Sequence, residues 1–129
     1  MLSEFVKTAD WKSEKHVPVI TCADTAAPGA ALDITVTVGK EIAHPNTTAH
    51  HISWIALHFV PAGAKASVEI TRCEFSAHGA SVEGADKGPA YTDSTVSIRA
   101  KFAVSGTLYA TAYCNIHGLW ASEKAITVA

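Results

Sequence analysis

Three separate segments of the sequence carry histidine and cysteine residues at spacings that suit one metal ion. They are Glu14-Lys15-His16, His44-x5-His50 and Cys114-x-x-His117. Imidazole nitrogens and a thiolate sulfur are ligands that zinc, copper and iron accept in proteins. A Cys-x-x-His pair in a turn can bring both side chains to one ion, and we expect Gly118 to relieve crowding behind that turn. The pattern predicts a mononuclear metal site with a single thiolate.

The middle segment shows how a loop could contribute two ligands. Pro45 biases His44 toward an extended backbone, so the segment can reach outward and return at His50. His50 and His51 are neighbours, and on a strand their side chains would point to opposite faces of the sheet. We therefore expect only one of these two to serve the site.

The ligand types favour iron over zinc and copper. A structural zinc site usually has four ligands, typically two or more of them cysteines, whereas here one cysteine accompanies an excess of histidines. Blue copper uses two histidines and a cysteine on a β-sandwich, usually with a weak axial methionine. The only methionine is Met1, and the chain has no glutamine to replace it. Copper stays open as an alternative, and iron with nitrogen and sulfur ligands fits better.

The remaining histidines and cysteines are predicted to be structural. A single buried histidine is usually a hydrogen-bonded core residue, and a buried cysteine behaves as a small hydrophobe. We place His51, His58 and His78 in the first group, and Cys22 and Cys73 in the second. Three widely spaced cysteines are an odd number, which argues against a disulfide framework.

Composition limits the classes of protein to consider. The chain has 129 residues, of which 48% are hydrophobic and 17% charged, with a formal net charge of −2. This predicts one domain over residues 1–129. The charge argues against binding to nucleic acid or to anionic lipid. No apolar segment at the N-terminus resembles a signal peptide, and the longest apolar run, Ile52 to Pro61, is too short to span a bilayer. We expect a cytoplasmic protein without a membrane partner.

Alternating apolar and polar residues predict an all-β fold, because side chains on a half-buried strand alternate between core and solvent. Turn signals rich in glycine and proline separate about seven such strands, as in an immunoglobulin-like β-sandwich. The predicted strands are Val17 to Thr21, Leu32 to Val38, Ile52 to Val60, Ser67 to Phe75, Thr95 to Val104, Thr107 to Tyr113 and Lys124 to Val128. The five candidate ligands fall at strand ends or in loops, whereas His58 lies inside a strand.

From the residues alone three functions remain open. A mononuclear thiolate site could serve an oxidoreductase, an electron carrier of cupredoxin type, or a structural or sensory metal module. Metal content and colour separate these functions.

The same segments resemble the superoxide reductases, in particular the one-iron neelaredoxin type, which is related to the C-terminal domain of desulfoferrodoxin. The resemblance covers nearly the whole chain. It rests on these motifs: Asp10-Trp11-Lys12, Glu14-Lys15-His16-Val17-Pro18, Gly39-Lys40-Glu41-Ile42, His44-Pro45-Asn46-Thr47-x-x-His50, Phe75-Ser76-Ala77-His78-Gly79 and Cys114-Asn115-Ile116-His117-Gly118-Leu119-Trp120. The extra N-terminal domain of the desulfoferrodoxins, with four cysteines and a second iron, has no counterpart here.

The resemblance implies a role for each residue of the site. Its iron would be bound in a plane by four histidines, with the thiolate of Cys114 as the axial ligand. Glu14 would occupy the position opposite Cys114 in the ferric state, and Lys15 would lie beside that position. The four histidines are His16, His44, His50 and His117.

The resemblance also implies an activity and partners. The reaction is the one-electron reduction of superoxide to hydrogen peroxide without production of oxygen. An electron donor such as rubredoxin restores ferrous iron, and a homo-oligomer, a tetramer among relatives, is expected.

Overall fold

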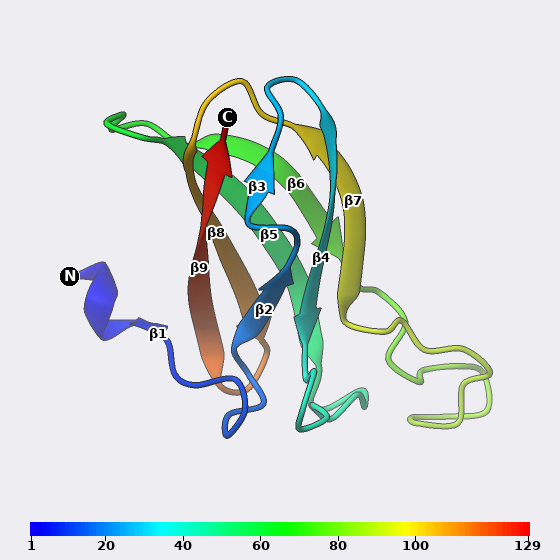
Figure 1. Ribbon diagram of the computed structural model, residues 1–129. Coiled ribbons are helices and arrows are strands. Elements are labelled where there is room, and N and C mark those ends of the chain that lie inside the picture. The colour runs from blue at the N-terminus through cyan, green and yellow to red at the C-terminus, as the bar shows by residue number, and fades with distance from the viewer.

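Two β-sheets face each other across an apolar core in the computed structural model, which describes residues 1–129 (Figure 1). The larger sheet has the order β1-β9-β8-β5-β6, with β3 also paired to β9, and the smaller has the order β2-β4-β7. Seven strands have four or more residues and two have only two, which confirms the predicted immunoglobulin-like sandwich. The elements are η1 (Leu2–Glu4), β1 (Val6–Lys7), β2 (Pro18–Thr21), β3 (Thr25–Ala26), β4 (Ala31–Val38), β5 (Ile52–Pro61), β6 (Val68–Glu74), β7 (Thr95–Lys101), β8 (Gly106–Cys114) and β9 (Gly118–Val128).

Strict alternation on β4 and β8 builds the middle of the core. On β4 the residues Leu32, Ile34, Val36 and Val38 are buried, while the polar residues between them are not. Burial alternates along β8 as well, and the inward row ends at Cys114, which is fully buried. The thiol is therefore the last member of an apolar row, fixed by the pleat of the strand.

The predicted strand bounds differ from the structure in a few places. β7 ends at Lys101, so Val104, which the predicted strand included, lies outside it and is 52% exposed. β9 begins at Gly118 and not near Lys124, because the turn after β8 pairs the two strands directly. Its first half lacks alternation, so the pattern did not reveal it. β1 and β3 have two residues each, too few for any periodic signal.

Strand register gathers the ligand-bearing segments at one end of the sandwich. Ile52 at the start of β5 pairs with Cys114 at the end of β8, and Cys114 pairs with Gly118. In the smaller sheet Pro18, at the start of β2, pairs with Val38 at the end of β4. The segment before β2, the β4–β5 loop and the β8–β9 turn therefore meet at the lower end in Figure 1.

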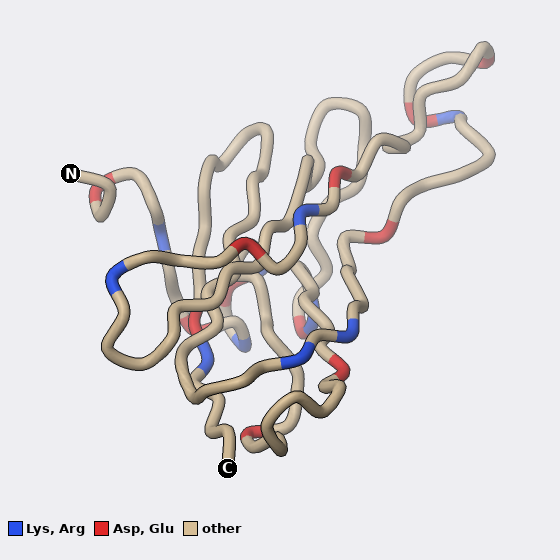
Figure 2. Tube along the Cα trace, turned by 90° about the horizontal axis from the view of Figure 1, so that it is seen from above, with Lys and Arg blue, Asp and Glu red and all other residues tan.

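The surface carries charges of both signs. Figure 2 shows lysine and arginine positions mixed with aspartate and glutamate positions over the whole trace. The single helical element, η1, is three residues long, and no helix has the length and apolarity needed to cross a membrane.

Candidate metal centre

Four of the five predicted ligands form one cluster at this end of the sandwich. The ligand atoms of His16, His50, Cys114 and His117 all lie within 4.8 Å of one another. They come from the segment before β2, the loop before β5, the end of β8 and the β8–β9 turn. His16 and Cys114 are buried, whereas His117 is exposed. The cluster is thus rooted in the core and open to solvent on one side.

His44, the fifth predicted ligand, lies against the same cluster. Its ring centroid is 4.9 Å from that of His16 and 4.8 Å from that of His50. Its Nδ1 donates to the carbonyl of Pro45 at 2.7 Å, which leaves a lone pair on Nε2. That Nε2 is the one buried side-chain nitrogen or oxygen atom without a hydrogen-bond partner. A buried acceptor without a donor is costly, and a metal ion would satisfy it.

Electrostatics keep His44 in the neutral form that binds metals. Burial lowers its pKa from 6.5 to about 4; the hydrogen bond to Pro45 opposes this shift, and the nearby His16, His50 and Lys15 add to it. Burial also lowers the pKa of His50, together with the charges of His117, His16 and Lys15. Metal binding requires neutral imidazole, so these shifts prepare both rings for a cation.

The other ring nitrogens also face one another without enough protons between them. His16 Nδ1 donates to Glu14 Oε1, since an ionised carboxylate can only accept, so the neutral ring of His16 carries a lone pair on Nε2. His16 Nε2 lies 3.1 Å from His117 Nδ1, and His50 Nε2 lies 3.2 Å from the same atom. One His117 proton can satisfy at most one of these contacts. Hydrogen bonds among these rings therefore cannot satisfy all of their lone pairs, whereas a bound cation could.

The turn after β8 holds the thiol and the imidazole of the Cys-x-x-His pair. Cys114 Sγ accepts the backbone N–H of His117 at 3.4 Å and lies 3.8 Å from His117 Nδ1. Gly118 has φ +84°, which disfavours residues with a side chain. A Cβ at this glycine would meet nothing within 4 Å, so the expectation that it relieves crowding is wrong. It is needed for the left-handed backbone that closes the turn.

Glu14 and Lys15 lie beside the cluster, not within it. Glu14 Oε1 accepts from the His16 backbone N–H at 2.9 Å as well as from Nδ1, which puts the carboxylate on the far side of the ring from Nε2. Burial raises the pKa of Glu14, but the hydrogen bonds and charge of His16 outweigh it, so the pKa is lowered. The charge of Lys15 reaches His44 and His50, whose pKa values it helps to lower.

Three supporting residues were not identified from the sequence. Gly39, with φ +87°, lets the chain approach His44, because a Cβ there would be 2.6 Å from the His44 backbone nitrogen. Trp120 stacks on His16 with centroids 5.0 Å apart and donates to the carbonyl of His117 at 3.2 Å. Asn115 binds the backbone of His51 and of Ala49, which ties the β8–β9 turn to the β4–β5 loop. All three belong to motifs quoted above, but their contacts appear only in the folded chain.

The histidines that we expected to be bystanders lie outside the cluster. His50 and His51 are in the loop before β5 rather than on a strand, yet their side chains diverge, and the ring of His51 stacks on His78 at 3.6 Å. His58 lies inside β5, 3.7 Å from Glu69. Cys22 and Cys73 are free and half-buried.

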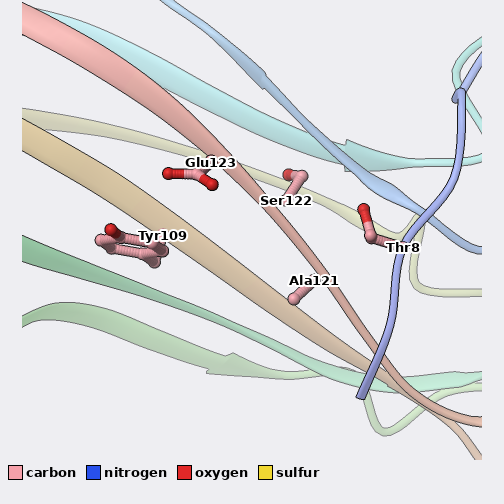
Figure 3. A pocket seen from close by; sticks show the side chains of 5 residues that line it. All are labelled: Thr8, Tyr109, Ala121, Ser122 and Glu123. Atoms are coloured by element: carbon pink, nitrogen blue, oxygen red, sulfur yellow. The ribbon is translucent and has the colours of Figure 1, made fainter. Parts of the chain in front are cut away.

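The most prominent surface hollow is not at the cluster. It lies over β8 and β9, against the segment that follows β1 (Figure 3). The residues that line it are Thr8, Tyr109, Ala121, Ser122 and Glu123. This set has no histidine or cysteine, and the metal chemistry is therefore assigned to the cluster.

The pKa of His44 predicts how the stability of the metal-free chain depends on pH. In the unfolded chain His44 binds a proton near pH 6.5, whereas in the folded chain it stays neutral down to about pH 4. The unfolded state then binds more protons in this window, so stability is lost as the pH falls through it. The thermal unfolding midpoint of the metal-free protein should decrease as the pH is lowered from 6.5 to about 4. The decrease should be smaller in His44→Phe. An equal pH dependence in the variant would remove His44 as a cause.

Comparisons with known proteins agree with this geometry. The desulfoferrodoxin family model matches residues 8–123. Neelaredoxin of Megalodesulfovibrio gigas is 50% identical over 127 residues, with 98% of each chain covered. A crystal structure of a Thermotoga maritima protein has a TM-score of 0.97 and 52% identity, and covers 100% of this chain and 98% of that one. The reduced superoxide reductase (neelaredoxin) of Archaeoglobus fulgidus has a TM-score of 0.88 and 50% identity, with 95% and 98% covered. On these matches, and on a cluster built by the motifs that they share, the chain belongs to the desulfoferrodoxin family.

Proposed function

We propose that this chain is a superoxide reductase, which reduces superoxide by one electron to hydrogen peroxide and produces no oxygen. The observation that carries the proposal is the cluster of imidazole nitrogens around one buried thiol, with a buried lone pair on His44 that has no partner. Family relatives named superoxide reductase support the activity. One iron per chain would be held by His16, His44, His50, His117 and Cys114.

The donor set suits the chemistry that the proposal requires. Bound iron would supply one electron to superoxide as it passes from the ferrous to the ferric state, and solvent would supply two protons. As a thiolate, Cys114 would donate electron density to the iron, an effect by which ligands tune iron centres. The backbone N–H of His117, 3.4 Å from the sulfur, limits that donation and fixes its direction.

Glu14 has a second role in the proposal, as a ligand of the ferric state. In the present arrangement its carboxylate is hydrogen-bonded to His16 through both the backbone and the ring. To become a ligand, the carboxylate would have to give up its hydrogen bond to His16 Nδ1. The half-exposed position of Glu14 leaves room for that movement.

Lys15 provides the local attraction for the anionic substrate. With a net charge of −2 the whole chain repels superoxide weakly, so attraction must come from a charge beside the open side of the cluster. We expect Lys15→Ala to slow the reaction with superoxide about tenfold and to weaken its dependence on ionic strength, within the range known for electrostatic steering. Pulse radiolysis at several salt concentrations measures both effects.

The matched control for Lys15→Ala is Lys65→Ala. Lys65 is exposed and lies in the β5–β6 turn at the opposite end of the sandwich. It should change neither the rate nor its salt dependence, and neither variant should lose metal. An unchanged rate in Lys15→Ala would remove this lysine from the mechanism.

One experiment tests the proposed function directly. Purified reduced protein receives a pulse of superoxide, and peroxide, oxygen and bound metals are then quantified. About one iron per chain and peroxide without oxygen support reduction. Oxygen in equal amount to peroxide indicates dismutation, and stoichiometric copper without iron indicates an electron carrier; either result overturns the proposal.

Other parts of the proposal carry over expectations from the sequence. Composition predicts a single domain over residues 1–129 and a cytoplasmic location, and the family resemblance implies a rubredoxin-like electron donor and assembly into a homo-oligomer such as a tetramer. Size measurement in solution and reduction of the oxidised protein by a rubredoxin test the assembly and the donor.

A further inference from the structure

The long segment between β6 and β7 contacts the β4–β5 loop that carries two of the ligands. This segment, residues 75–94, lies at the lower right in Figure 1, beside that loop. Three hydrogen bonds join them: His78 to Asn46, Asn46 to Thr92, and Asp86 Oδ1 to the backbone N–H of Thr48 at 2.7 Å. All of them fall between the ligands His44 and His50. The segment is therefore placed to hold the ligand loop in its conformation.

His78 is the centre of these contacts, because both of its ring nitrogens face oxygen atoms. Nδ1 lies 2.8 Å from Asn46 Oδ1, and Nε2 lies 2.6 Å from the carbonyl oxygen of Phe75. The ring of His51, the residue after a ligand, stacks on it at 3.6 Å with the planes 5° apart. No other histidine outside the cluster has two such partners.

The orientation of the Asn46 amide fixes which atom faces His78. Asn46 Nδ2 donates to the carbonyl of Thr92 at 2.9 Å. Turning the amide over would place Oδ1 against that carbonyl, two acceptors in contact, and would lose the bond. Thr92 is itself fixed, since its backbone N–H donates to the carbonyl of Ala77 and its Oγ1 accepts from the Ala77 N–H. The oxygen of Asn46 therefore faces His78.

Two acceptors around one imidazole determine its number of protons. A neutral ring has one N–H and one lone pair, so it can satisfy Asn46 or Phe75 but not both. Only the doubly protonated ring donates to both oxygens at the observed distances. A ring held in this way can neither flip nor rotate without breaking a hydrogen bond.

We propose that His78 is a positioning residue for the metal centre. It donates from both ring nitrogens, fixes Asn46, and through Asn46 sets the path of the chain between the ligands His44 and His50. This inference rests on the proposed metal site, but not on the reaction performed there. Because His78 acts through Asn46 alone, substitutions at these two residues can distinguish its effect on the metal site from a general contribution to folding.

Opposing influences act on the proton of His78. Burial lowers the pKa of His78 below its ordinary value; the hydrogen bond to the carbonyl of Phe75 raises it and the stacked His51 lowers it further, so the net shift is downward. His51 is the titratable group that faces it, and Nδ1 of His51 donates to the carbonyl of Thr47 at 2.8 Å. The oxygen of Asn46 acts in the same direction as the carbonyl of Phe75, because a hydrogen bond to the charged form favours that form.

The first test counts protons on the ring. The zinc-loaded chain, labelled with ¹⁵N in its histidines, is studied by NMR at about pH 7, above the ordinary histidine pKa. His78 should show a proton on both nitrogens. A single proton on His78 would overturn the double-donor role. The count does not depend on activity, so it stands even if superoxide is not reduced.

The second test separates the two hydrogen bonds by substitution. In His78→Asn the side-chain amide replaces Nδ1 and keeps the donor to Asn46, whereas in His78→Gln the amide replaces Nε2 and keeps only the donor to Phe75. Loss of an outer partner of a metal site typically costs 10- to 100-fold in affinity. We expect His78→Gln to weaken Co²⁺ binding about tenfold and to change the Co²⁺ absorption spectrum, and His78→Asn to restore both. Equal losses in the two variants would overturn the route through Asn46.

A double-mutant cycle completes the test. If His78 acts through Asn46, then His78→Gln should have no further effect on Co²⁺ affinity in an Asn46→Ala background. Additive losses would mean that the two residues act separately, and the positioning role would be rejected.

Discussion

Replacing Cys114 with serine should abolish the thiolate-to-iron charge-transfer band of the oxidised protein and lower the rate of superoxide reduction by at least about 100-fold. A direct ligand should matter more than an outer partner, whose loss typically costs 10- to 100-fold. Serine is not a substitute, because its hydroxyl is protonated at neutral pH and lacks the soft character of a thiolate. Absorption spectra and stopped-flow kinetics measure the two effects.

The fold should survive this substitution. Serine is smaller than cysteine and its oxygen can accept the backbone N–H of His117 that Cys114 Sγ now accepts. The matched control is Cys22→Ser, which changes a half-buried thiol that touches the core but belongs to no ligand cluster. That control should keep the band and the rate. A Cys114→Ser spectrum identical to wild type would mean that the thiolate is elsewhere.

Much of the fold was predictable because one-sided burial leaves a period of two in the sequence. β4 and β8 show this alternation, and each of their predicted bounds lies within one residue of the observed one. The first half of β9 was missed because its burial is intermediate on both faces, so nothing in its sequence alternates. Its position follows from the hairpin with β8, a tertiary constraint.

The ligands were predictable for a different reason. Several histidines and a cysteine at strand ends are typical of a metal site. In addition, the three motifs that contain them follow one another along the chain in the same order as in one known family. The structure adds the tautomer of two of these rings. His44 Nδ1 and His16 Nδ1 each face an acceptor, so their Nε2 atoms carry the lone pairs. That step depends on the position of a carbonyl and of a carboxylate.

The contacts around the ligand loop were not predictable. His78 and Asn46 are 32 positions apart, and neither side chain has a motif of its own that indicates a partner. His78 was interpreted as a structural histidine, which its hydrogen bonds confirm, but its link to the ligand loop appears only in the folded chain. Likewise, the position of Glu14 behind His16 depends on a rotamer that no pattern encodes.

Replacing His44 with phenylalanine should affect the metal-free and the metal-loaded protein in opposite directions. In the metal-free chain Nε2 is a buried acceptor without a donor, and such a group costs about 1–3 kcal/mol. Phenylalanine keeps a planar ring of similar size and removes that atom. The free energy of unfolding of metal-free protein should therefore rise by about 1 kcal/mol, measured by denaturant titration.

Metal binding should show the reverse. With one of five ligands gone, affinity for Co²⁺ or Fe²⁺ should fall by more than the roughly 100-fold that outer partners can cost, so metal should no longer stabilise the folded chain. His58→Phe, a change of the same kind at the half-exposed β5 histidine, should alter neither affinity nor the response to metal. If His44→Phe destabilises the metal-free protein and keeps its affinity, then His44 is a structural residue. A gain without metal combined with a loss with metal identifies a side chain kept for binding at the expense of stability.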